Sequence, residues 1–384
     1  MNRTLLTLLI CVSLSNSPPL HSATRKLSSL EGALAPYLKT APLTTSTVFE
    51  KERFPNIVVT LKGTLLATYG SSSVRAKRST DGGKTWGEDI TVADPGFHGG
   101  GTTIDESTGD ILVFVEEKHP PAPLTIYRSV DDGVTWNAET PKIYPDSRGN
   151  LPSMHMNEHG ITLRRGKSPG RLLRASRYYG KQNKREEWPT HYTGAVYSDD
   201  HGKTWFTSDP FPENGTGEAA VAELWNGKIY YNSRVHWQER PNNLRRRDAI
   251  STDAGKSWNQ WRIIEVLPDG PQDTNYGCMG GLCRLNVSGQ DILIYSNCDS
   301  PSGRKQGTVW ASFDGGKTWP IKRLVYEGRF AYSSLCSGRP NTATEGSIFL
   351  HFEGGPEGSS TLAKFNLAWI LEGEPTGDGI PPRF

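Results

Sequence analysis

STDGGKTW, at Ser79–Trp86, is the first of five copies of a phrase of the form Ser-x-Asp-x-Gly-x-(Thr/Ser)-Trp. The other copies are SVDDGVTW, SDDHGKTW, STDAGKSW and SFDGGKTW, which begin at Ser129, Ser198, Ser251 and Ser312. Successive copies begin 50, 69, 53 and 61 residues apart. Repeats of this length have the size of one supersecondary unit and indicate stacked or radial repetition.

Each copy of the phrase predicts a tight hairpin turn. The Asp carboxylate accepts local backbone N–H groups, the Gly supplies a positive φ, and the Trp packs its ring between neighbouring sheets. A short apolar-polar alternation, typical of a strand, precedes four of the copies. A turn repeated around a rim cannot form one active site, so we interpret the phrase as structural and not as a Ca²⁺ or sugar site.

The composition suits many short strands joined by turns. The 384 residues include 41 Gly and 11 Trp, and no sustained helical period follows the N-terminal region. The net charge is only +2, with 43 basic and 41 acidic side chains, so no nucleic-acid partner is expected. We interpret the run Arg245–Arg247 as a solvated strand end.

The N-terminus has the pattern of an export signal. Residues 1–23 contain an early Arg, an apolar run too short to span a bilayer, and small residues suited to a cleavage site near Ala23. We therefore expect no membrane span and an exported protein, periplasmic or extracellular. The mature chain keeps an even number of cysteines, which permits two disulfides in three possible pairings. They are Cys278, Cys283, Cys298 and Cys336. Their loose spacing and the lack of clustered His disfavour a metal site.

Six units of about 60 residues follow from Arg53 onward, each with a polar entrance and a strand–turn–strand plan. The pattern predicts an all-β fold, a six-bladed β-propeller formed by residues 45–384 after a lead-in at residues 24–44. We expect Thr45–Phe49 to pair with Ala363–Leu371, because a terminal strand commonly completes the blade formed by the other end and removes both exposed edges.

In such a ring the entrance of every first strand and the exit of every second strand meet the axis on one face. The entrances supply Arg53, His98, Glu158 or His159, Glu218 and Tyr332, and the exits supply Arg234, Arg304 and Glu353. Three converging arginines would repel one another unless a bound anion neutralises them. Their planar guanidinium groups suit bidentate binding of a carboxylate. A phenol becomes a nucleophile only beside a base, a role that Glu218 can fill for Tyr332.

These residues resemble those of the sialidase (exo-α-neuraminidase) family. The repeated phrase looks like that family's Asp box, and five segments match its site motifs in order. They are RFPNIV with Arg53, TGEAAVAELWNGKIYYNSR with Glu218 and Arg234, SGRKQGTVWASFDGGKTW with Arg304, AYSSL with Tyr332, and IFLHFE with Glu353. The resemblance covers Arg53 to the C-terminus.

The resemblance implies an exported exo-α-sialidase that acts on sialylated glycans by retaining hydrolysis. Its nucleophile would be Tyr332, with Glu218 as base, the three arginines holding the sugar's carboxylate, and Glu353 orienting one of them. No metal or organic cofactor is implied. We expect Asp273 to lie near the glycerol or N-acyl side of the sugar. The alternatives are a hydrolase of another carboxylated sugar, such as a uronate, and a non-catalytic glycan-binding propeller.

The chain departs from the family at the acid/base position. The family's acid/base Asp lies between the second strand of the first blade and the first box, but residues 69–78 contain no carboxylate. Loss of a general acid typically costs about 10²–10⁴-fold in rate, so a substitute is expected. The candidates are His98 and Asp94 at the next entrance, followed by the group His155, Glu158 and His159.

Overall fold

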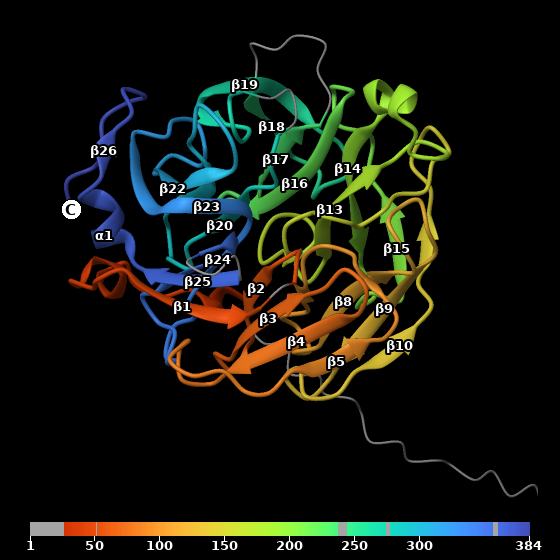
Figure 1. Cartoon of the computed structure of the whole chain (residues 1–384), viewed down its shortest axis with the longest axis horizontal. Helices are drawn as coiled ribbons and strands as arrows, with labels where there is room; N and C mark the ends of the chain where they lie inside the picture. Colours follow the sequence, from red (N-terminus) through yellow and green to blue (C-terminus); the bar gives the residue numbers. More distant parts are fainter. Residues whose placement is uncertain (1–26, 51, 237–243, 274–276, 356–359) are drawn as a thin grey trace, which may run out of the picture.

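The structure, a computed structural model, describes residues 27–50, 52–236, 244–273, 277–355 and 360–384. Mostly antiparallel sheets are arranged radially around a central axis, as in a β-propeller (Figure 1). The described part of the chain carries helix only in short pieces, η1 (Leu27–Leu30), η2 (Ala35–Leu38), η3 (Arg185–Thr190) and α1 (Leu367–Leu371). None of these helices is long and apolar enough to cross a bilayer. The predicted export signal lies outside the described residues.

The first four blades are separate sheets. Blade one contains β2 (Asn56–Val59), β3 (Leu65–Tyr69), β4 (Val74–Ser79) and β5 (Ile90–Ala93). Blade two contains β6 (Phe97–His98), β7 (Thr103–Ile104), β8 (Ile111–Glu116), β9 (Leu124–Ser129) and β10 (Asn137–Glu139). Blade three contains β11 (Lys142–Tyr144), β12 (Ile161–Thr162), β13 (Leu172–Tyr178), β14 (Tyr192–Ser198) and β15 (Thr204–Thr207). Blade four contains β16 (Thr216–Glu223), β17 (Ile229–Val235), β18 (Arg245–Ser251) and β19 (Asn259–Pro268).

The remaining strands form one eight-stranded sheet. They are β20 (Gly281–Arg284), β21 (Leu293–Cys298), β22 (Lys305–Ser312), β23 (Ile321–Ser337), β24 (Ile348–Gly354), β25 (Ser360–Phe365), β1 (Thr44–Phe49) and the short β26 (Glu374–Pro375). The 17-residue β23 pairs with β22 through its first part and with β24 through its second. It is therefore the outer strand of one blade and the inner strand of the next. Counted as two blades, this sheet gives the six blades expected from the sequence.

The two ends of the chain close the ring. Strand β1 pairs antiparallel with β25, from Thr44 opposite Lys364 to Phe49 opposite Ser360, which is the pairing predicted from the repeats. The predicted bounds of the partner, Ala363–Leu371, were wrong at both ends, because β25 begins at Ser360 and stops at Phe365, after which α1 follows. The side chain of Asn366 accepts a hydrogen bond from the backbone N of Trp369 at 3.0 Å and so caps the helix.

The five repeated phrases form the same turn. In the first, Asp81 Oδ1 accepts hydrogen bonds from the backbone N of Lys84 and of Thr85 at 3.0 Å, and Oδ2 accepts one from the Thr85 hydroxyl at 2.6 Å. Two consecutive residues have positive φ in every copy, for example Gly82 at 74° and Gly83 at 85°. Each carboxylate thus satisfies the backbone of its own turn, which confirms the structural interpretation.

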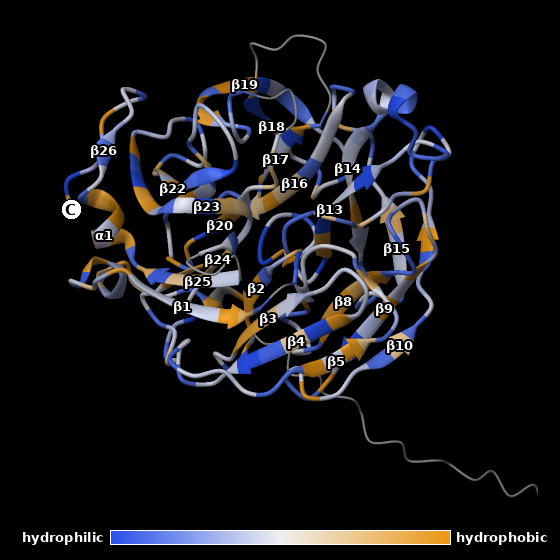
Figure 2. Cartoon of the chain, in the orientation of Figure 1, coloured by the Kyte–Doolittle hydropathy of each residue, from blue (hydrophilic) through white to orange (hydrophobic). Residues whose placement is uncertain are grey.

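The core lies between adjacent blades. Apolar residues concentrate on the strands, whereas many of the loops are hydrophilic (Figure 2). The Trp residues of the last three boxes are buried in these layers, whereas Trp86 and Trp136 are half-buried. Packing between blades fixes the radial arrangement, and the inner strand ends consequently face the axis.

Candidate active site

The predicted entrances and exits gather at one end of the axis. Tyr332 of β23 lies at the centre, with the guanidinium carbon of Arg304 4.8 Å and that of Arg53 5.4 Å from the centroid of its ring. Arg234 and Glu218 also lie close enough to Tyr332 to change the pKa of its phenol. The structure therefore brings these five residues together, although up to 279 positions separate Arg53 from Tyr332 in the chain (332 − 53).

Glu353 orients Arg53. The Nε and Nη2 of Arg53 donate to the two carboxylate oxygens of Glu353 at 3.2 and 3.3 Å, and the backbone N of Phe54 donates to one of them at 3.0 Å. This fork-to-fork pair fixes the plane of the guanidinium. The Glu353 side chain is buried, whereas the Arg53 side chain is 48% exposed. The guanidinium thus stays accessible to a ligand.

Glu218 lies between two buried arginines. Its carboxylate pairs with Arg234, and its other oxygen lies 3.8 Å from Nη1 of Arg177. Burial alone would raise the pKa of Glu218, but Arg234 and Arg177 outweigh burial and lower it. The pKa of Tyr332 is raised, by burial and by the nearby Glu218 charge, against the opposing effect of Arg234 and Arg304. An ionised carboxylate beside a protonated phenol is the arrangement that a base and its nucleophile require.

The first two candidates for the missing acid, His98 and Asp94, lie outside the group around Tyr332. His98 is 1% exposed, its Nε2 lies 3.0 Å from the Thr68 hydroxyl, and burial lowers its pKa to about 3. The ring of His98 is therefore neutral at physiological pH. Asp94 is 58% exposed and forms an ion pair with Arg75 at 3.6 Å. The partners of these side chains, Thr68 and Arg75, belong to blade one and not to the group around Tyr332.

The second group of candidates is His155, Glu158 and His159, and two of these residues link strands around the axis. Glu158 is fully buried and accepts hydrogen bonds from Asn56 Nδ2 at 3.0 Å, from the Ser334 hydroxyl at 2.5 Å, and from two backbone N–H groups. His159 Nε2 lies 2.9 Å from the carbonyl oxygen of Leu335. Both residues thus tie first strands of different blades together. Only His155 of this group reaches the site, through its ring, 5.0 Å from that of Phe54.

Asp273, predicted to line the pocket, accepts hydrogen bonds from the backbone N of Gly303 at 3.2 Å. That contact places it beside the segment that carries Arg304. Cys278 also lies near this arginine, because Arg304 Nη2 donates to the carbonyl oxygen of Gly277 at 3.2 Å. The four cysteines of the described residues are buried free thiols, so the two disulfides that the sequence permits are not formed there. The thiols of Cys278 and Cys298 share a hydrogen bond.

Sequence reasoning missed three side chains of the site, Arg177, His119 and Tyr179. Arg177 stacks on the Tyr179 ring at 4.1 Å, and its Nη2 donates to His191 Nδ1 at 3.1 Å. Arg177 is the next-to-last residue of the second strand of blade three, just as Arg234 is in that of blade four. The rule that placed Arg234 at the axis also applies to Arg177. No comparable signal singles out His119, which lies on a loop.

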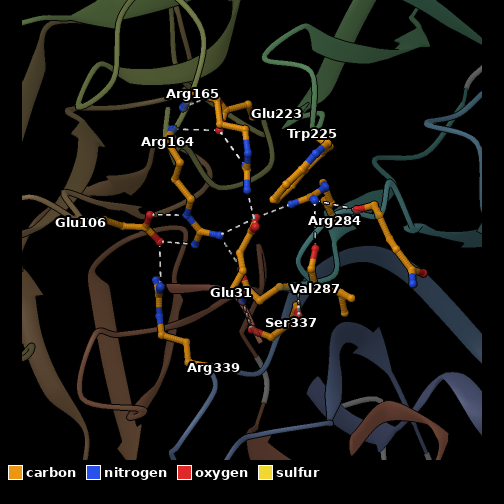
Figure 3. Close-up of polar contacts among 12 residues, drawn as sticks. Glu31, Glu106, Arg164, Arg165, Glu223, Trp225, Arg284, Val287, Ser337 and Arg339 are labelled. Atoms are coloured by element: carbon orange, nitrogen blue, oxygen red, sulfur yellow. Dashed lines mark hydrogen bonds and ion pairs between the residues drawn. The ribbon is translucent and has the colours of Figure 1, made fainter. Parts of the chain in front are cut away.

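A second ionic cluster surrounds Glu31 (Figure 3). Glu31, from the lead-in, accepts hydrogen bonds from Arg284 at 2.6 Å and Arg164 at 3.4 Å, and it also pairs with Arg165. A cavity of about 120 Å³ lies beside these side chains, lined by the far ends of the inner strands of all six blades. Because Glu218 and Tyr332 lie near the beginnings of these inner strands, the cavity is at the other end of the axis.

Within the described residues, no three His, Cys, Asp or Glu side chains are placed to hold a metal ion. The site is a set of guanidinium groups around one phenol. Such a set can bind a carboxylate and hold it beside a nucleophile.

Comparison with known proteins gives sialidases among the relatives. Residues 69–344 match the model of the BNR repeat-like domain. The chain is 30% identical to a sialidase of Micromonospora viridifaciens over 84% of its own length and 52% of that relative, and 30% identical to a sialidase of Bacteroides fragilis over 74% and 57%. The structure of the Hadza microbial sialidase Hz136 superposes with a TM-score of 0.64 at 25% identity, covering 83% of this chain and 66% of that one. The chain thus spans about half the length of the curated relatives it matches.

Proposed function

The chain belongs to the BNR repeat-like family, among propellers of the sialidase type, and from that premise we propose that it is an exo-α-sialidase, which hydrolyses terminal sialic acids from glycans. The observation that carries this proposal is the placement of the Arg53 and Arg304 guanidinium groups within 5.4 Å of the Tyr332 ring centroid. Positive charge around a potential nucleophile suits a substrate that carries an anion at the reacting carbon.

The three arginines of the sequence motifs would hold the substrate's carboxylate. A sialic acid carries this group on its anomeric carbon, so a ligand gripped there presents that carbon to Tyr332. Arg53 is already oriented by Glu353, and Arg234 by Glu218. Little side-chain reordering would therefore be needed on binding, which favours both affinity and alignment.

Tyr332 would act as the nucleophile and Glu218 as its base. As the phenol oxygen attacks the anomeric carbon, its proton passes to the Glu218 carboxylate, and the glycosidic bond breaks. A neutral phenol approaches the negatively charged sugar with less repulsion than a carboxylate nucleophile would. Sialidases are the recognised exception to the two-carboxylate scheme for this class of enzyme. Water then hydrolyses the tyrosyl intermediate, so the anomeric configuration is retained.

We also propose that the protein is exported, on the signal pattern of residues 1–23. Sialylated glycans are found outside the cytoplasm of cells, so an exported protein would meet its proposed substrate. The chemistry needs protons, water and fixed charges, all of which the protein and solvent can supply.

The test is hydrolysis of 4-nitrophenyl α-sialoside, followed by proton NMR of the first sugar released. We expect α-sialic acid as the first product, and loss of turnover in Tyr332→Phe. Tyr326→Phe is the matched control, because Tyr326 lies on the same strand and packs on Phe352 at 5.8 Å, away from the arginines. Turnover of an aryl uronide but not of the sialoside would support a different acidic sugar. Binding without turnover, unaffected by Tyr332→Phe, would indicate a glycan-binding propeller.

A further inference from the structure

The proposed reaction needs a group that protonates the departing oxygen, and the sequence has no carboxylate where the family places its acid. His119 lies on the loop that follows β8, at the exit of blade two. Its ring centroid is 5.1 Å from that of His155, 5.7 Å from Phe97 and 5.6 Å from Tyr179. These rings form a wall at the axial end of blades two and three.

The same wall continues to the nucleophile. The His155 ring lies 5.0 Å from Phe54, and the Phe54 ring stacks on Tyr332 at 6.2 Å. Glu218 and Arg177 lie close enough to His119 to influence its pKa. His119 is therefore at the edge of the same site, on the loop adjacent to the short blade-one exit where the carboxylate is missing.

His119 differs from the buried histidines in two respects. It is exposed, so solvent can return a proton to it. Its Nδ1 lies 3.1 Å from the carbonyl oxygen of Pro120, and Asn183 Nδ2 donates to the same oxygen at 3.2 Å. Asn183 Nδ2 also lies 3.3 Å from Nδ1. A carbonyl oxygen only accepts, so the tautomer that pairs with Pro120 carries its proton on Nδ1. The second nitrogen, Nε2, is left as the atom that gains and loses a proton.

We propose that His119 is the acid/base residue of this site, an inference that rests on the proposed sialidase function. In the first step the proton on Nε2 passes to the glycosidic oxygen as its bond to the anomeric carbon breaks. Tyr332 bonds to that carbon, and its own proton passes to Glu218. In the second step Nε2 takes a proton from the attacking water. The bond to Tyr332 breaks, and Glu218 returns the proton to the phenol oxygen.

The charges facing His119 predict how the rate depends on pH. Partial desolvation of the ring lowers the pKa of His119 below 6.5 and Arg177 lowers it further, whereas the hydrogen bond to Pro120 and the charge of Glu218 oppose them. The neighbouring histidines His155 and His236 have pKa values well below 6.5, so they are neutral near pH 6. The acid form of His119 is needed for the first step. With a poor leaving group, kcat/KM should therefore fall as pH rises through the pKa of His119.

The test compares two substrates in His119→Gln. With 3′-sialyllactose, whose leaving group is poor, we expect kcat/KM to fall about 10²–10⁴-fold. With 4-nitrophenyl α-sialoside, whose leaving group needs no proton, we expect less than about a tenfold fall. The fall of kcat/KM at higher pH should disappear with sialyllactose. Glu117→Gln is the matched control, since Glu117 is exposed on the same loop, and both rates should match those of the wild type.

Equal losses on the two substrates would overturn the assignment, because a merely structural role does not depend on the leaving group. Unchanged rates would also overturn it. A leaving-group-dependent loss in His98→Gln or Glu117→Gln, without one in His119→Gln, would move the role to that residue. If the wild-type protein cleaves neither sialoside, the proposed function itself fails, and the inference fails with it. If the wild type cleaves both sialosides and His119→Gln cleaves them at wild-type rates, only the assignment of His119 fails and the proposed function stands.

Discussion

Glu31 should hold the lead-in against the ring, and its replacement by Gln tests this. The Glu31 side chain is fully buried, and it pairs with Arg164, Arg165 and Arg284, whose side chains are 7–14% exposed. The wider cluster is balanced, with those three arginines and Arg339 facing four carboxylates. The carboxylates are Glu31, Glu106, Glu223 and Asp291. Glu31→Gln leaves one buried positive charge without compensation.

The expected cost is large for a substitution that preserves shape. Removing one partner of a buried ion pair typically destabilises by about 3–5 kcal/mol. The slight exposure of the arginines favours the lower end, about 3 kcal/mol. At about 2.1 cal/mol/K per residue, unfolding this 384-residue chain has an entropy of roughly 0.8 kcal/mol/K. The melting temperature should therefore fall by about 4 °C.

The measurement is thermal unfolding followed by tryptophan fluorescence, with the wild type and Glu327→Gln scanned alongside. Glu327 is exposed on β23, and its replacement removes the same charge from the surface. The double variant Glu31→Gln/Arg165→Gln restores the charge balance and should recover part of the loss. A melting temperature of Glu31→Gln within 1 °C of wild type would refute the reasoning.

Three further predictions concern the site, the pH dependence and the turns. Arg304→Lys keeps the charge but loses the planar fork, so KM for an aryl sialoside should rise about 10–100-fold, whereas Arg329→Lys, at an exposed position, should leave KM unchanged. Burial alone would raise the pKa of Glu106, but Arg164 and Arg339 lower it to about 2 from 4.5. The stability that ionised Glu106 contributes is thus complete above about pH 4.5 and is lost as pH falls toward 2. In urea unfolding at a series of pH values, the free energy of unfolding should therefore fall less with acid for Glu106→Gln than for the wild type. Asp253→Ala removes a carboxylate that accepts from Lys256 N, Ser257 N and two hydroxyls, so the free energy of unfolding in urea should fall by about 1–2 kcal/mol; a change below about 0.3 kcal/mol would contradict that role.

The sequence was sufficient for the radial architecture because its signals are local. An Asp box satisfies its own backbone within a few residues, so its turn forms whatever surrounds it. Five such turns at intervals of 50–69 residues left few folds other than a propeller. The closing pair of strands followed from the need to remove exposed edges, although Asn366 ends the partner strand earlier than the apolar pattern indicated.

The site was only partly predictable. Arg53, Arg234, Arg304, Glu218 and Tyr332 could be selected because ring symmetry brings strand entrances and exits to one end of the axis. Arg177 satisfies the same rule and was overlooked. The rule selects positions and does not report burial, so it also selected His98, whose fully buried ring has a pKa of about 3, and Glu158, which braces the first strands.

The amino-acid sequence by itself determined the repeating turns, the ring that they imply, and the residue types suited to an anionic sugar. Only the tertiary structure decided which histidines join the wall of rings that ends at Phe54 and Tyr332, which arginines share Glu218, and that Glu31 pairs with arginines at the far end of the axis. The physical reason is that a turn depends on neighbours along the chain, whereas the ionisation and contacts of a side chain depend on groups brought close by folding. His119 and Glu31 have no distinctive sequence context, and packing alone gives them their neighbours.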